Sequence, residues 1–189
     1  ELDSHAGDGD FGMSVAKGFR CLKEQWKQIV GNAATIGDFL GQSAMVIMEH
    51  CGGASGPIWG SAFRGAARSA GAKTSLNTQE IAQMLQAART GVQTTGERSF
   101  GRGAVVGDKT LIDALVPFAD TWTALAQTEA PVSAIARKAA EAAVAGAAAT
   151  EKIVARMGRA GTVGERSLGY PDAGAYALGV IFTMLADVL

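Results

Sequence analysis

Three aspartates lie close together near the start of the chain, in the run ELDSHAGDGDFG at residues 1–12. Asp3, Asp8 and Asp10 are separated by glycines that allow sharp turns, and no Lys or Arg occurs before Lys17. Converging carboxylates repel one another unless a hard cation lies between them. The pattern therefore favours a Mg²⁺ site, and nucleotide phosphate is the usual companion of Mg²⁺ in such a site.

A second motif, GGASGP at residues 52–57, directly precedes a predicted helix. Backbone amides at a helix N-terminus, together with the Ser55 hydroxyl, form a natural cradle for phosphate. The alternative is a plain glycine turn in which Ser55 caps the helix. The motif alone leaves both interpretations open.

The segment GRGAVVGDKT at residues 101–110 is superficially similar to a P-loop. Asp108 separates Gly107 from Lys109, and no predicted strand precedes the segment, so a Walker A site is excluded. Two interpretations remain for this loop. Asp108 caps it as a structural turn, or the loop lines a nucleotide base or ribose.

A further glycine-rich segment at residues 158–174 contains two arginines with planar donors suited to phosphate. They are Arg159 and Arg166, and Glu165 could instead tie Arg166 into a structural pair. Asp172 precedes the last predicted helix, where N-capping is the simple role.

Neither histidine nor cysteine suggests nucleophilic catalysis. His5 either orients a neighbouring carboxylate or faces solvent, and His50 ends an apolar helix, where packing or capping is expected. Cys21 and Cys51 have no basic partner nearby in sequence and no metal-ligand spacing. We expect both thiols to be reduced in a cytoplasmic protein.

The composition suits one compact domain over residues 1–189, with 48% hydrophobic and 19% charged residues. The net charge of −1 leaves no basic excess for nucleic acid or an anionic membrane. We see no apolar stretch long enough to span a bilayer and no secretory signal. Because the chain opens abruptly at its richest motif, a helix before Asp3 is expected to be missing.

Helical periodicity dominates the chain, and no convincing strand is present. Thr35 with Asp38, and Asn77 with Glu80, are expected N-cap pairs. Glycines concentrate in four expected loops, at residues 7–12, 52–60, 96–107 and 158–174. The seven predicted helices cover about residues 11–30, 35–50, 57–70, 77–93, 109–127, 131–156 and 175–189. Helix packing is the cheapest way to bury their apolar faces, so we predict an all-α fold.

Taken together, the motifs resemble the nucleotide-binding L subunit, or L domain, of dihydroxyacetone kinases over essentially the whole chain. The resemblance depends on four segments in order, which are DSHAGDGDFG at 3–12, GGASGP at 52–57, GDKTLIDAL at 107–115 and GERSLGYPDAG at 164–174. It implies a closed barrel of eight antiparallel helices, of which seven are predicted here. It also implies a Mg²⁺- and ADP- or ATP-dependent kinase subunit.

The resemblance carries particular roles onto residues of this chain. Asp3, Asp8 and Asp10 would be the catalytic residues, holding two Mg²⁺ ions that bridge the nucleotide phosphates. The remaining cofactor-binding residues would be Phe11, Gly12, Met13 and Ser14 at a helix start, Ala54 and Ser55 at phosphate, Gly103 and Leu111 at the base, and Arg159 and Asp172 in the lid. Family members commonly have His or Thr in place of Phe11 and Asn in place of Ser14.

The same resemblance implies that a separate K subunit supplies the sugar on one of its histidines, so this chain alone would be inactive. The nucleotide exchanges as ATP in one family branch. In the other, ADP stays bound and is rephosphorylated by a phosphotransferase-system phosphocarrier protein. Dihydroxyacetone is the default acceptor and erythrulose an alternative, and a homodimer is an open alternative for assembly.

Three competing interpretations remain. The nucleotide domain of fatty acid kinases shares the acidic loop, although the GERS segment at 164–167 favours the dihydroxyacetone branch. A regulatory module could bind nucleotide and a partner without transferring phosphate. An inert helical bundle would show no Mg²⁺-dependent stabilisation by ADP.

Overall fold

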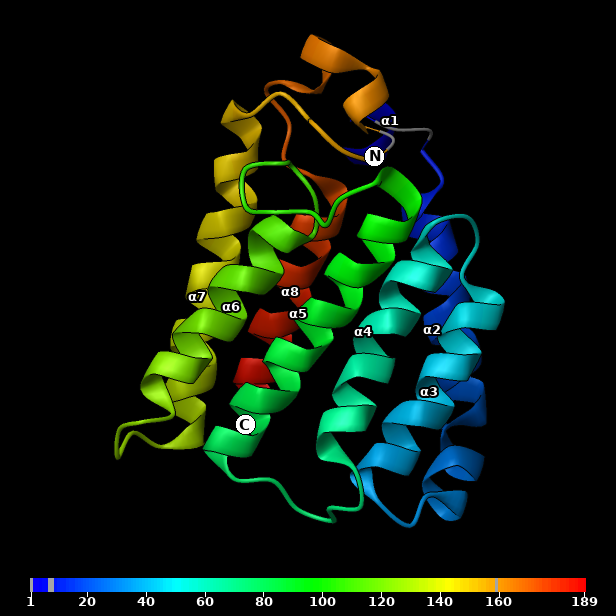
Figure 1. The fold of residues 1–189 in the computed structure, drawn as a ribbon, viewed down its shortest axis with the longest axis vertical. Coiled ribbons are helices and arrows are strands. Elements are labelled where there is room, and N and C mark those ends of the chain that lie inside the picture. Colours follow the sequence, from blue (N-terminus) through cyan, green and yellow to red (C-terminus); the bar gives the residue numbers. More distant parts are fainter. Residues whose placement is uncertain (1, 7–8, 159) are drawn as a thin grey trace. The chain divides into compact units, whose positions relative to one another are not determined.

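The computed structural model describes residues 2–6, 9–158 and 160–189, and every regular element among them is helical, which confirms the predicted all-α class (Figure 1). The α-helices are α1 Leu2–Ala6, α2 Phe11–Asn32, α3 Ile36–His50, α4 Ser55–Ala70, α5 Thr78–Phe100, α6 Ile112–Leu125, α7 Val132–Ala149 and α8 Ala173–Val188. Three short 3₁₀ helices follow α7, and they are η1 Thr150–Lys152, η2 Ala160–Thr162 and η3 Gly164–Ser167.

These helices form two compact units. The first unit is continuous and covers residues 11–103, with α2 to α5; the second combines residues 1–10 and 104–189. Within each unit, neighbouring long helices run antiparallel, as Figure 1 shows for α3, α4 and α5. This agrees with the antiparallel packing that the predicted barrel requires.

The helix count differs in detail from the expectation. One α-helix of the described chain was not predicted, the short α1, and Asp3 lies inside it. The helix expected ahead of Asp3 stays a prediction. The glycine distribution also differs, because Gly56 and Gly60 lie inside α4 and Gly96 lies inside α5. Glycine is therefore used within helices as well as in the loops.

Interior glycines bring α4 and α5 unusually close together. A Cβ added to Gly65 of α4 would collide with the carbonyl oxygen of Ala87 on α5. Reciprocally, a Cβ on Gly91 of α5 would collide with the carbonyl oxygen of Ser61 on α4. The helix-forming cost of each glycine is offset by close backbone packing, which larger side chains would prevent.

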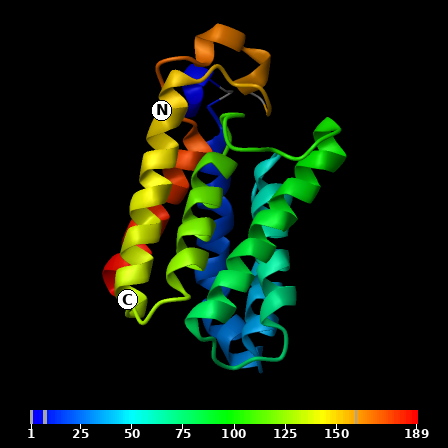
Figure 2. The ribbon, with the colours of Figure 1, turned by 60° about the vertical axis from the view of Figure 1, so that its left-hand side comes forward.

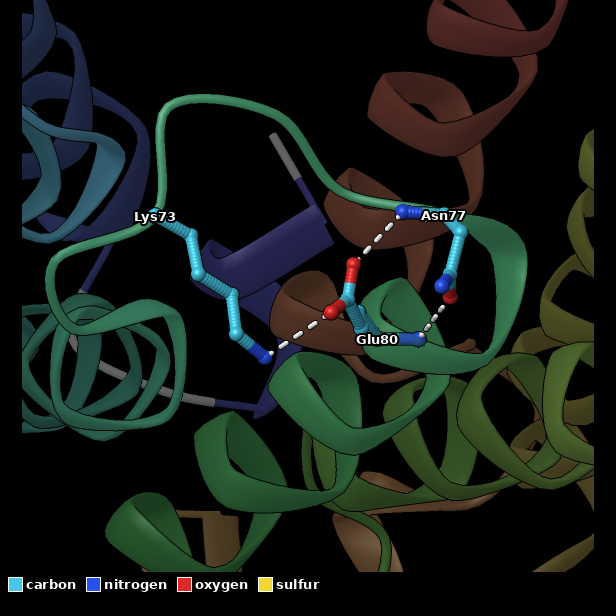
Figure 3. A network of polar contacts seen from close by, with 3 residues as sticks. All are labelled: Lys73, Asn77 and Glu80. Carbon is cyan, nitrogen blue, oxygen red and sulfur yellow. Dashed lines mark hydrogen bonds and ion pairs between the residues drawn. The ribbon is translucent and has the colours of Figure 1, made fainter.

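Caps predicted from the sequence are present at two helix starts. The Thr35 hydroxyl accepts the Asp38 amide at 3.0 Å ahead of α3. Figure 3 shows the reciprocal box at α5, where the Asn77 side chain accepts the Glu80 amide at 2.9 Å and the Glu80 carboxylate accepts the Asn77 amide at 2.8 Å. Lys73 pairs with Glu80 at 3.1 Å, and the Asn77 amide, followed by Lys73, lowers the pKa of Glu80.

Helix ends were less well predicted than helix starts. The predicted end of α5 near residue 93 is wrong, because the helix continues to Phe100 and stops at Gly101, which has a φ of 78°. The predicted end of α7 near residue 156 is also wrong. It stops at Ala149, where the chain tightens into the 3₁₀ helix η1, and the Thr150 hydroxyl donates to the carbonyl of Ala147 at 2.5 Å. Two predicted helix starts are wrong by less: α4 begins two residues before Pro57, and α6 begins three residues after Lys109.

The second unit buries a core between α6, α7 and α8. Figure 2 shows α7 in yellow beside α8 in red. Phe118 of α6 stacks on Phe182 of α8 with ring centroids 3.7 Å apart, and both rings are buried. A buried alanine stripe on α7 allows its neighbours to approach closely; its members are Ala136, Ala139, Ala140, Ala143 and Ala147. None of the helices in the described residues has both the length and the apolar character needed to cross a bilayer.

The α4–α5 contact yields a stability prediction. Replacing Gly65 with Ala should lower the free energy of unfolding by about 1–3 kcal/mol, because the new methyl group overpacks against backbone. Gly41→Ala in α3 is the matched control. Its Cβ would meet no atom within 4 Å, so it should instead stabilise the protein by about 0.5–1 kcal/mol. Urea unfolding of both variants would contradict the packing argument if they shifted stability in the same direction.

Candidate functional site

The acidic segment contains the first predicted metal ligands. Asp3 is partly buried in α1, and Asp10 is exposed immediately before α2. Within the described chain, no hydrogen bond or ion pair holds the Asp10 carboxylate. Asp8 lies outside the described residues. Among the described residues, no three His, Cys, Asp or Glu side chains lie close enough together to hold a metal ion. Since Asp8 is not among these residues, convergence of the three aspartates stays a prediction.

The first unit brings together two of the predicted phosphate segments. The Ser14 hydroxyl, in the first turn of α2, donates to the carbonyl of Gly52 at 2.8 Å. This bond ties the start of α2 to the glycine segment that leads into α4. Two helix N-termini therefore lie beside each other, and both favour an anion. Phe11 is partly buried there, whereas Gly12 and Met13 are exposed.

The start of α4 contradicts one interpretation of the glycine motif. Ser55 is the first helical residue and partly buried, so it is not the N-cap; the exposed Ala54 occupies that position without any side-chain hydrogen bond. Gly56 is buried, and its missing Cβ avoids the carbonyl oxygens of Met48 and Cys51. The first amides of α4 thus lack the side-chain cap that would compete with a bound anion.

A buried lysine organises the second unit. Lys109 is 1% exposed and has a φ of 63°, a left-handed conformation that is rare for residues other than glycine. Its Nζ donates to the carbonyl oxygens of Ile153 at 3.0 Å and Tyr170 at 2.7 Å, and also to that of Ser167. All three acceptors belong to the segment between α7 and α8, drawn from yellow to orange in Figure 1.

The three acceptors imply that Lys109 is protonated, because an ammonium has three donors and a neutral amine has only two. Burial lowers the pKa of Lys109, while the carboxylates of Asp172, Glu151 and Asp113 act in the opposite direction. The neighbouring carboxylates therefore help to keep the buried Lys109 side chain protonated.

Two buried aspartates shape the loop before α6. The Asp113 carboxylate accepts the amides of Gly107 at 2.6 Å and Thr110 at 2.7 Å, and that of Asp108 accepts the Val105 amide at 2.9 Å. Burial raises the pKa of Asp113, and the two amide donors partly offset this. The structural interpretation of Asp108 as a loop cap is confirmed.

The segment between α7 and α8 is further held by two buried hydroxyl groups. The Thr150 hydroxyl accepts the Asp172 amide at 2.8 Å, so the two ends of the segment meet. The Ser167 hydroxyl accepts the Ala155 amide at 2.9 Å and donates to the carbonyl of Gly164 at 2.7 Å. These bonds explain why a glycine-rich stretch adopts one defined path.

Asp172 caps α8, as the sequence suggested. Its carboxylate accepts the Ala175 amide at 2.8 Å. Burial raises the pKa of Asp172 to about 7, and the Ala175 amide acts in the opposite direction. Leu111 lies nearby, since a Cβ on Gly174 would meet both Leu111 and Asp172 at 3.1 Å. The second unit thus brings together two of the predicted nucleotide contacts.

The remaining predicted contacts are placed as follows. Gly103 is partly buried beside Gln93, just after the end of α5 in the first unit. Arg159 lies outside the described residues.

Sequence reasoning missed the roles of Lys109, Asp113 and Tyr170. The first two stood inside a recognised motif, but no role was given to either. A lysine between two aspartates, beside glycine in a short loop, was the available signal of a buried charge. Tyr170 carried no such signal, because it is its backbone carbonyl that binds Lys109.

Comparison with known proteins places the chain in a family. A family model described as the DAK2 domain matches residues 5–187. The chain belongs to this family. The predicted relationship to the nucleotide-binding subunit of dihydroxyacetone kinases is thereby confirmed, since several relatives carry that name over the full chain length.

Three relatives illustrate the similarity. The chain is 34% identical over 185 residues to the PEP-dependent dihydroxyacetone kinase, ADP-binding subunit DhaL, of Escherichia coli (strain K12), covering 98% of this chain and 84% of that protein. It is 31% identical over 188 residues to the ADP-binding subunit DhaL of PEP-dependent dihydroxyacetone kinase 2 from Listeria innocua, covering 100% and 84%. It is 32% identical to the L-erythrulose kinase of Pectobacterium atrosepticum, covering 100% of this chain but 31% of that longer protein.

The buried ammonium makes a testable contribution to stability. Lys109→Met should lower the free energy of unfolding by about 3 kcal/mol or more, because three carbonyl groups, that of the buried Ser167 among them, lose their charged donor. Lys152→Met, at an exposed lysine of the same segment, is the matched control and should change stability by about 0.5 kcal/mol or less. Equal effects of the two variants on chemical denaturation would contradict the role of Lys109.

The raised pKa of Asp172 predicts a pH-dependent difference from Asp172→Asn, which keeps a capping oxygen. Between pH of about 4 and about 7 the folded protein retains a proton that the unfolded chain releases, so wild-type stability falls as pH rises through this window. The variant lacks this titration. Its free energy of unfolding should therefore rise relative to that of the wild type by at most about 1.4 kcal/mol per pH unit across this window. Urea unfolding of nucleotide-free protein at several pH values measures the difference, and parallel profiles would contradict it.

Proposed function

We propose that this chain is the Mg²⁺- and ADP/ATP-binding subunit of a dihydroxyacetone kinase. It would transfer a phosphoryl group to a keto-triose or keto-tetrose held by a partner K subunit. The observation that carries the proposal is the similarity, across the whole chain, to proteins named as ADP-binding subunits of such kinases. The DAK2 family model spans both structural units, which supports one nucleotide-binding domain over residues 1–189.

The donor set suits Mg²⁺. Three aspartates within one short segment supply hard oxygen ligands, and the exposed Asp10 carboxylate is not consumed by another described side chain. Asp3, Asp8 and Asp10 would hold two ions. When bound, Mg²⁺ supplies positive charge that offsets the charge spreading over the transferred phosphoryl group.

The protein's own groups would bind and orient the nucleotide. Amides at the starts of α2 and α4, in residues 11–14 and 54–55, would hold the phosphate oxygens. Gly103 and Leu111 would line the base, and Arg159 and Asp172 would complete the enclosure. Since phosphoryl transfer depends mainly on position and electrostatics, such a site needs no nucleophilic side chain.

The same relatives support a proposal for the phosphate donor. Similar proteins are named as subunits of PEP-dependent or PTS-dependent kinases, which favours ADP as a resident cofactor and a phosphocarrier protein as partner. Both cysteines are free thiols, in keeping with a cytoplasmic location.

The donor and acceptor can be identified by reconstitution. Purified chain is mixed with a K subunit and dihydroxyacetone, and is supplied either with Mg-ATP or with PEP and the phosphotransferase proteins. Turnover in the second mixture alone supports the resident-ADP branch, and turnover in neither contradicts the proposed function. Erythrulose is the second acceptor to test, because one relative is named an L-erythrulose kinase.

The metal assignment predicts the effect of Asp10→Asn. Loss of one carboxylate should abolish phosphoryl transfer and the Mg²⁺-dependent rise in melting temperature with ADP. In the wild type, ADP at 100 times its Kd should stabilise the folded state by about 2.7 kcal/mol. Because Asp10 is exposed, the melting temperature without ligand should not change. Asp187→Asn, at another exposed aspartate, is the control. Wild-type ADP binding by Asp10→Asn would overturn the metal assignment.

A further inference from the structure

Two exposed rings from opposite ends of the chain stack on each other in the second unit. The imidazole of His5, on α1, lies nearly parallel to the phenol ring of Tyr170, with centroids 4.1 Å apart and planes 2° apart. Tyr170 is 39% exposed, and His5 is exposed as well. Neither ring is placed there by burial in a core, so the contact is a specific pairing between two segments.

The Tyr170 side of this stack is firmly fixed. Its carbonyl oxygen accepts the buried Lys109 ammonium at 2.7 Å. The preceding residue, Gly169, has a φ of 87° and donates its amide to the carbonyl of Glu151 at 2.8 Å. The backbone that carries the phenol ring is thus tied at two consecutive residues.

The His5 side has little stability of its own. Helix α1 contains five residues, and isolated helices of this length do not persist in water. Its position must therefore come from tertiary contacts. In Figure 1, α1 lies under the orange segment that contains η3, and residue contacts between the two confirm that they are neighbours.

The stack and Asp3 involve different faces of α1. Residues two apart on an α-helix project about 200° from each other. Asp3 and His5 therefore leave α1 on nearly opposite faces. The ring contact can therefore fix the rotation and position of the helix from the face opposite Asp3.

We infer that Tyr170, held by Lys109, is a positioning residue that fixes α1 through His5 and so sets the Asp3 carboxylate for its divalent cation. This inference rests on the proposed function, which assigns Asp3 to the metal. Residues that orient metal ligands typically change metal affinity about 10–100-fold when they are removed. A surface stack with no positioning role would leave metal affinity unchanged.

The test uses the full chain with Tyr170→Ala, Tyr170→Phe and the matched control Tyr176→Ala, which removes another exposed tyrosine of the second unit. Two quantities are measured. The first is hydrogen exchange of the α1 amides without ligand. The second is the Mg²⁺ concentration that gives half of the ADP-dependent rise in melting temperature.

Tyr170→Ala should speed exchange in α1 and raise the Mg²⁺ midpoint about tenfold. Tyr170→Phe keeps the ring and should match the wild type, as should Tyr176→Ala. His5→Ala should behave like Tyr170→Ala, and the double variant should be no worse than either single variant, because both remove the same contact.

Wild-type exchange and midpoint in Tyr170→Ala would overturn the inference. So would a Tyr170→Phe variant as impaired as Tyr170→Ala, since the hydroxyl and not the stack would then matter. Additive effects in the double variant would overturn it as well. The proposed function fails separately, if wild-type protein shows no Mg²⁺-dependent response to ADP. In that case the role in metal affinity fails with it, while hydrogen exchange still reports whether the stack fixes α1.

Discussion

One buried ammonium group determines how the second unit is built. Lys109 lies in a left-handed backbone conformation that costs about 1–2 kcal/mol, and its charge is removed from water. Three charge-assisted hydrogen bonds to carbonyl groups offset these costs. Without this cation, three carbonyl oxygens of a glycine-rich stretch would lose their charged donor, and that of Ser167 is buried. The path of the segment between α7 and α8 and the place of Tyr170 depend on it.

Local signals in the sequence predicted the helices well where both partners of an interaction were near in sequence. The caps at Thr35 and Asn77 join residues three positions apart, so their pattern is visible without a structure. Helix ends were harder. Gly96 looked like a stop signal although one glycine costs a helix only about 1 kcal/mol, and the chain continues to Gly101, whose left-handed conformation ends α5. The end of α7 depends on Thr150, a residue with no strong helix-ending tendency.

In the candidate site, too, local features were predicted and interactions between residues distant in sequence were not. The predicted start of α2 at Phe11 agrees with the structure, whereas α4 begins at Ser55, inside the glycine motif, and not at the predicted Pro57. The bond from Ser14 to Gly52, which joins residues 38 apart, was not predicted. The acceptors of Lys109 are 44, 58 and 61 residues away. Spacing rules contain no information at such distances. The sequence therefore identified these residues only as parts of motifs. Their role as buried charges that order the loops became visible only in the structure.

The second unit is discontinuous along the chain, since residues 1–10 belong with residues 104–189. During synthesis on the ribosome, the 11–103 unit has all of its own contacts available first. Helix α1 must wait until Tyr170 has emerged before its aromatic partner exists. Domains generally fold as units in the order of synthesis, so α1 acquires its final position last. The nascent protein therefore cannot fix the position of α1 before the rest of the second unit has been made.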